Sequence, residues 1–112
     1  MKYIATSSLN IDNILSTESI SPFPFYDTRS FGYNKFIQID ELKNCDSILL
    51  FSEIPYFEIE DEQRENHPMV VQIDDEYQLK NVQMLGNFAG CEVYAYEKTI
   101  LIKIALIVKC AN

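Results

Sequence analysis

The chain has 112 residues, a formal net charge of −8 at pH 7 and a hydrophobic content of 47%. A chain of this length supports one domain with one core, and its apolar content excludes disorder caused by a lack of burial. With 9 basic against 17 acidic residues, it has no basic stripe to neutralise phosphates, which argues against direct nucleic-acid binding. We therefore expect a single folded domain over residues 1–112.

Cysteine and histidine usage argues against a metal or a secreted, disulfide-bonded scaffold. The three cysteines are far apart with no Cys-x-x-Cys pair, and His67 is the only histidine, so the spacing of a zinc site is absent. The N-terminus lacks the apolar core of a signal peptide, and the longest apolar stretch, residues 100–108, contains a lysine. We expect a cytoplasmic, reduced protein with no cofactor and no membrane association.

The N-terminal third predicts a strand followed by a helix. Residues 2–6 alternate polar and apolar side chains, which favours a short strand. Side-chain oxygens at residues 7–10 can cap free backbone N–H groups, just before apolar residues spaced i, i+3, i+4 from Ile11. The helix should end by Ser19, because the Ser-Pro-Phe-Pro sequence at 21–24 requires extended or turn conformations at and before each proline.

Residues 23–33 predict a long loop that holds five aromatic rings in eleven residues. Rings at that density either cover a core, which is the favoured interpretation, or form a contact surface. The contact surface is the alternative because aromatic side chains beside an arginine are the usual energetic centre of an interface. Its candidate residues are Phe25, Tyr26, Arg29, Phe31 and Tyr33.

The rest of the chain predicts strands at residues 35–39, 47–51, 69–73, 91–96 and 100–108, with 97–99 as a hairpin turn. The last of these is long enough to be the central strand. It is apolar on both faces and needs cover on both sides, so a homodimer is possible. Residues 76–85 show both helix and strand spacing. The predicted fold class is α+β, mainly an antiparallel sheet with one N-terminal helix and possibly a second short helix.

The net charge is concentrated in residues 53–76, which we name the acidic segment. It holds nine carboxylates and one base, so it carries −8, whereas the rest of the chain has eight acidic and eight basic residues. Its densest part, residues 57–65, falls between the predicted strands that end at 51 and begin at 69, so we expect it on a surface connection, with Tyr56, Phe57 and Ile59 as apolar anchors between the acids. The candidate contact residues are Glu53, Tyr56, Phe57, Glu58, Glu60, Asp61, Glu62, Glu65, Asp74, Asp75 and Glu76.

Carboxylates at this spacing repel one another, so the acidic segment lowers the stability of the fold unless a positive charge offsets the repulsion. One interpretation is a solvated face that promotes solubility. The other is a docking surface for a basic protein, whose lysine- and arginine-rich groove it would occupy in competition with nucleic acid. A metal site is disfavoured because the EF-hand order of acids followed by glycine is missing. Acid/base catalysis is disfavoured because nothing in the sequence isolates one carboxylate from solvent. We assign no catalytic residue and no metal ligand.

The N-terminal residues YIATSS, NIDNIL and ISP resemble the opening strand, helix and turn of ADP-ribosyltransferase-like domains, especially those of bacterial toxins that act on nucleic acid. In that family a first-strand histidine or arginine, followed by Thr or Ser, helps to hold NAD, and a late-strand glutamate completes the site. This chain has Ala5 at the first position, and Glu92 or Glu97 is the candidate for the second. The resemblance implies a divergent NAD-binding domain whose active site is lost or incomplete.

In size and charge the chain looks like phage-encoded inhibitors of bacterial immune nucleases, including anti-CRISPR proteins, whose targets carry basic nucleic-acid channels. This similarity implies a small, acidic, non-enzymatic protein that occupies the nucleic-acid-binding surface of an effector nuclease. The ADP-ribosyltransferase-like NAD-binding domain is the alternative from a different functional class.

Overall fold

The structure is a computed structural model that describes residues 2–22, 40–42, 45–55, 57–58, 67–73, 76–88, 90–101 and 107–109. Within these ranges the chain forms the expected α+β fold, with one α-helix and a mainly antiparallel sheet. No helix in these ranges is long and apolar enough to cross a membrane. The elements are β1 (Lys2–Ser7), the 3₁₀ helix η1 (Ser8–Asn10), α1 (Ile11–Thr17), β2 (Ser19–Ile20), β3 (Ile48–Phe51), β4 (Pro68–Ile73), the 3₁₀ helix η2 (Glu76–Gln78), β5 (Gln83–Phe88), β6 (Cys91–Tyr96), β7 (Ile100–Leu101) and β8 (Ile107–Lys109).

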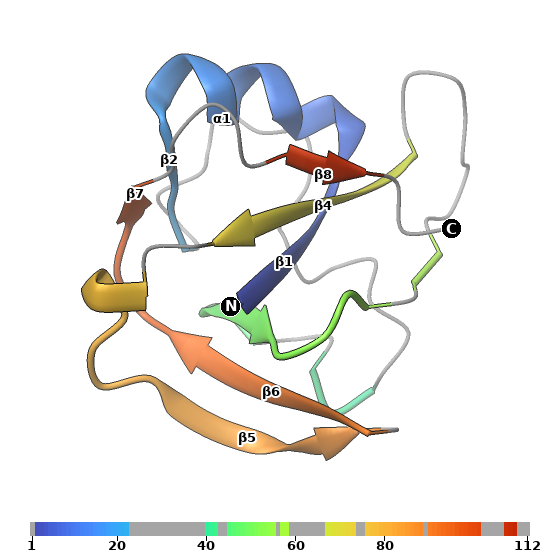
Figure 1. Ribbon diagram of the computed structural model, residues 1–112, viewed down its shortest axis with the longest axis vertical. Coiled ribbons are helices and arrows are strands. Elements are labelled where there is room, and N and C mark those ends of the chain that lie inside the picture. Colours follow the sequence, from blue (N-terminus) through green and yellow to red (C-terminus); the bar gives the residue numbers. More distant parts are fainter. Residues whose placement is uncertain are drawn as a thin grey trace.

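The larger sheet has the strand order β5-β6-β3-β1-β4-β8, with each neighbouring pair antiparallel, and β2 and β7 form a separate antiparallel pair (Figure 1). β3 and β4 flank β1 and both run antiparallel to it, so they are parallel to each other. Tyr3 pairs with Phe51 and Lys2 pairs with Ile73. The C-terminal ends of β3 and β4 therefore lie at the same end of the sheet, where β1 begins.

Strand side chains alternate between the two faces of the larger sheet and divide the core into two clusters. In β3, Ile48 and Leu50 belong to the first cluster, whereas Leu49 and Phe51 belong to the second. α1, β2 and β7 cover the first face, and residues from connecting segments cover the second. The first cluster is Ile4, Ile14, Ile20, Ile48, Leu50, Val71, Ile73, Tyr96 and Ile100, and the second is Ala5, Leu42, Leu49, Phe51, Phe57, Val70 and Val93.

The predicted helix is confirmed, and its boundaries follow from local contacts. Ser7 Oγ accepts a hydrogen bond from the backbone N–H of Leu9 at 3.1 Å, which caps the turn that leads into α1. Ile14 faces the core with no exposed area. The helix ends at Glu18, whose backbone is left-handed with φ 52°.

The predicted strands at residues 2–6, 47–51, 69–73 and 91–96 are confirmed as β1, β3, β4 and β6. The predicted strand at 35–39 and the aromatic loop at 23–33 lie outside the described residues. The ambiguous residues 76–85 contain a single 3₁₀ turn, η2, and the start of β5.

The prediction of one central strand over residues 100–108 is wrong. Ile100 and Leu101 pair with β2 in the small sheet, whereas Ile107–Lys109 pair with β4 at one end of the larger sheet's described order. Residues 97–99 therefore connect two sheets and do not form a hairpin turn. An apolar run specifies burial but not the pairing partner, and here Ile20 takes Ile100 as its partner.

Candidate protein-binding surface

The first part of the acidic segment belongs to a crossover connection, residues 52–67, that leads from β3 to β4. Because these strands are parallel with β1 between them, the connection must travel from one end of the sheet to the other. Figure 1 shows the chain leaving β3 in green and rejoining the fold at the start of β4. Phe57, within the crossover, packs in the second core cluster, so this residue of the crossover covers the second face of the sheet.

Three sets of contacts hold the described part of the crossover to the body of the protein. Ser52 N–H donates to the Glu92 carbonyl at 2.9 Å, and Ser52 Oγ accepts from Glu92 N–H at 2.8 Å. Phe57 is inserted into the core with 2% of its surface exposed. At the far end, His67 N–H donates to Ser8 Oγ and Ser8 N–H donates to the His67 carbonyl, both at 2.9 Å. The crossover is therefore attached on both sides of residues 59–66.

Phe57 and its neighbour Glu58 lie in opposite environments, one buried and the other exposed. The interpretation of Phe57 as an apolar anchor on a partner-binding surface is therefore corrected, because its ring covers the strands beneath the crossover. Glu53 is also exposed, and no ion pair joins its carboxylate to another described residue. The described part of the crossover presents carboxylates outward and an aromatic ring inward.

β4, the strand predicted at 69–73, divides the acidic segment into two groups. Residues 53–65 precede β4, and residues 74–76 follow it after six strand residues, or about 20 Å of extended chain. The second group starts directly after Ile73, at the end of the sheet where Phe51 also ends β3. Glu53, two residues beyond Phe51, leaves from that same end.

The side chains of the remaining predicted contact residues lie outside the described residues, so their role in binding stays a prediction. Glu76 opens η2, and its backbone alone is described. The others are Tyr56, Glu60, Asp61, Glu62, Glu65, Asp74 and Asp75 of the acidic segment, and Phe25, Tyr26, Arg29, Phe31 and Tyr33 of the aromatic loop.

The residues named by the ADP-ribosyltransferase resemblance do not lie on neighbouring strands. Ala5, on β1, is 2% exposed in the second core cluster, whereas Glu92 lies on β6 and Glu97 just beyond it, with β3 between the two strands. In the described ranges, no three His, Cys, Asp or Glu side chains are grouped so that they could hold a metal ion. No protein-family model, curated protein or solved structure matches this chain. Its function is therefore argued from its own geometry and charge.

Proposed function

We propose that this is a non-enzymatic protein that binds a basic protein partner through the acidic segment. The observation that carries the proposal is the separation of charge, because the segment holds the whole net charge of −8 and the rest of the chain is neutral. The crossover geometry supports it, since Glu53 and Glu58 are exposed while Phe57 anchors the same connection in the core. An anchored surface loses less conformational entropy on binding than a free tail would, which favours affinity.

The partner chemistry that fits this surface is a groove rich in lysine and arginine. A concentrated negative potential speeds the encounter with such a groove and competes there with the phosphates of nucleic acid. The nucleic-acid channel of a bacterial immune nuclease has this chemistry, and similarity in size and charge to anti-CRISPR-type inhibitors suggests that class of target. Such targets are cytoplasmic, and we propose the same location for this protein.

The experiment reverses four carboxylates on the crossover, Glu58, Glu60, Asp61 and Glu62, to lysine. Each reversal adds two charges, so the net charge of the variant changes from −8 to zero. Binding is measured by surface plasmon resonance against a panel of purified effector nucleases, at low and at high salt. We expect the wild-type chain to bind a nuclease and displace its nucleic acid, and the variant to associate on the order of tenfold more slowly, as high salt also causes.

A matched control variant separates the crossover from net charge alone. It reverses four acids outside the acidic segment, all exposed, and also has zero net charge: Asp12, Asp40, Glu41 and Asp46. We expect its association rate to stay close to that of the wild type, apart from the loss of long-range attraction. An unchanged rate for the crossover variant at low salt, or an equal loss in both variants, contradicts the proposal.

A calorimetric titration with NAD tests the alternative from the other functional class. The protein-binding proposal predicts no heat of binding. Saturable binding with a micromolar dissociation constant would instead support a divergent ADP-ribosyltransferase-like domain.

A further inference from the structure

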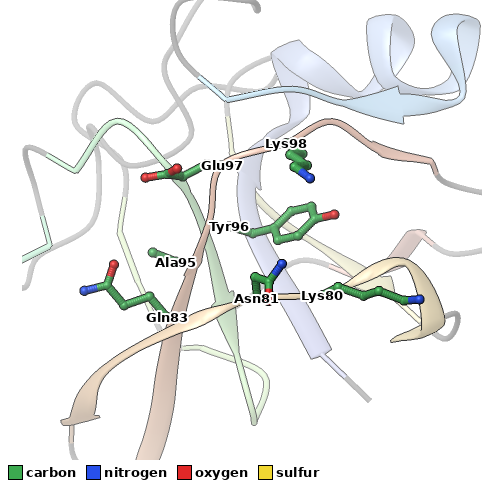
Figure 2. Close-up of a pocket in the computed structure, with 7 residues that line it drawn as sticks. All are labelled: Lys80, Asn81, Gln83, Ala95, Tyr96, Glu97 and Lys98. Carbon is green, nitrogen blue, oxygen red and sulfur yellow. The ribbon is translucent and has the colours of Figure 1, made fainter.

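A pocket lies where β5 and β6 separate, and none of its lining residues belongs to the acidic crossover (Figure 2). β5 begins at Gln83, opposite Ala95, whereas β6 continues to Tyr96, which pairs with β3 on its other side. Asn81, two residues before β5, has a left-handed backbone with φ 63°, which turns the chain away from the line of the strand. The space left between residues 80–83 and 95–98 is a cavity of about 160 Å³.

The pocket combines a fixed aromatic wall with polar side chains that have no partner among the residues that the structure describes. Tyr96 is 6% exposed, and its hydroxyl donates to the Gln78 carbonyl at 2.8 Å, which fixes the ring. Figure 2 shows this ring between Lys98 and Asn81, with Lys80 on the same side and Glu97 and Gln83 on the opposite side. In the described part of the chain, none of the polar lining side chains forms a hydrogen bond or an ion pair. These side chains are Lys80, Asn81, Gln83, Glu97 and Lys98, all exposed to solvent.

Positive charge gathers at this pocket although the protein as a whole is acidic. The structure describes three lysine side chains, and two of them, Lys80 and Lys98, line the cavity, against one carboxylate, Glu97. The third, Lys2, lies over the Tyr94 ring, with 5.2 Å from Nζ to the ring centroid. Because the net charge of −8 repels anions, an anion in this pocket must be held by local donors.

We propose that this pocket binds a small oxyanion, the carboxylate or phosphate group of a compact ligand. Lys80 and Lys98 supply ammonium donors and Asn81 supplies amide N–H donors on the side of the Tyr96 ring, and these are the groups that recognise such oxygens. At about 30 Å³ for each water molecule, the cavity has room for roughly five waters, well below the size of pockets for drug-sized ligands. The ligand is therefore compact, and it has little apolar surface to bury, because the Tyr96 ring is itself only 6% exposed. This site uses none of the residues proposed to bind a protein partner.

The test is an NMR titration of the isotope-labelled full chain with sodium acetate and, separately, sodium phosphate, with sodium chloride at matched ionic strength as the reference. We expect saturable shifts of the backbone amide signals of residues 80–83 and 95–98 with at least one of the two anions. The two arms distinguish carboxylate from phosphate recognition. The absence of saturable shifts with both anions, or shifts equal to those in chloride, overturns the proposal.

Four variants test the direction of each charge effect. An exposed charge pair contributes up to about 1 kcal/mol, or about fivefold, so replacing both Lys80 and Lys98 by glutamine should weaken binding on the order of tenfold. Glu97→Gln should strengthen it, because the variant removes the one repelling carboxylate. Lys2→Gln, which also removes one positive charge, should leave the affinity unchanged. Equal weakening by Lys2→Gln and by Lys80→Gln alone overturns the site, and amide spectra of each variant verify that it is folded.

Discussion

Replacing Phe57 by alanine tests whether the acidic crossover is fixed to the core. The ring is 2% exposed and packs in the second cluster with Leu49, Phe51 and Val93. Its removal exposes apolar surface and leaves a cavity beneath the crossover, and truncating a buried phenylalanine in this way costs about 3–5 kcal/mol. A domain of this size has a total stability of roughly 5–15 kcal/mol, so the variant loses a large part of its free energy of unfolding.

The measurement is urea-induced unfolding at equilibrium, followed by circular dichroism, with a thermal melt in parallel. For a chain of 112 residues, each 1 kcal/mol lowers the melting temperature by roughly 4 °C, so Phe57→Ala should lower it by roughly 12–20 °C. Glu53→Ala is the matched control, because Glu53 lies on the same crossover and is exposed, and no ion pair joins it to another described residue. We expect that control to change stability by no more than about 0.5 kcal/mol.

A loss below about 1 kcal/mol for Phe57→Ala, or equal losses for the two variants, would refute the burial of this ring and the anchored crossover with it. The comparison also separates the two roles of the segment. Glu58→Lys should slow association with a basic partner at full stability, whereas Phe57→Ala should act first on stability.

Two further predictions concern the β-sheet connections, and urea unfolding measures both. Gln78→Ala should cost about 1–2 kcal/mol, because the Gln78 side chain accepts from Leu101 N–H and donates to the Leu101 carbonyl, each at 2.8 Å; an unchanged midpoint would show that this pair does not stabilise β7. Gly86→Ala should cost about 1–3 kcal/mol, since Gly86 has φ +152° and an added Cβ would lie 3.2 Å from a phenylalanine ring of the same strand. Gly90→Ala, with φ +85° and open space around the added Cβ, should cost less, about 1 kcal/mol, and the reverse ranking would contradict this account.

Local sequence patterns predicted much of the described secondary structure. Alternating side chains at 2–6 and 91–96 specified β1 and β6, because a strand places successive residues on opposite faces. The apolar spacing from Ile11 specified α1, and the downstream prolines excluded its extension. These signals are readable because each depends on the backbone preferences and burial of neighbouring residues alone.

Two features of the candidate sites, the pocket and the burial of Phe57, could not be predicted from local sequence patterns. Asn81 gave no sequence signal for a pocket, because the pocket exists only where its left-handed backbone turns the chain away from β6. Phe57 stood among carboxylates, so its neighbours suggested exposure, although the crossover brings it over the second cluster. Each of these outcomes depends on contacts between residues distant in the chain.

The amino-acid sequence by itself determined that the protein is a small α+β domain whose whole net charge lies in residues 53–76. Only the tertiary structure decided that Phe57 is buried beneath the acidic crossover, and that residues 100–101 and 107–109 belong to different sheets. The physical reason is that composition and periodicity state which side chains favour burial or solvent. Contacts between residues that are distant in the chain decide which strands pair, and this pairing sets the position of each surface.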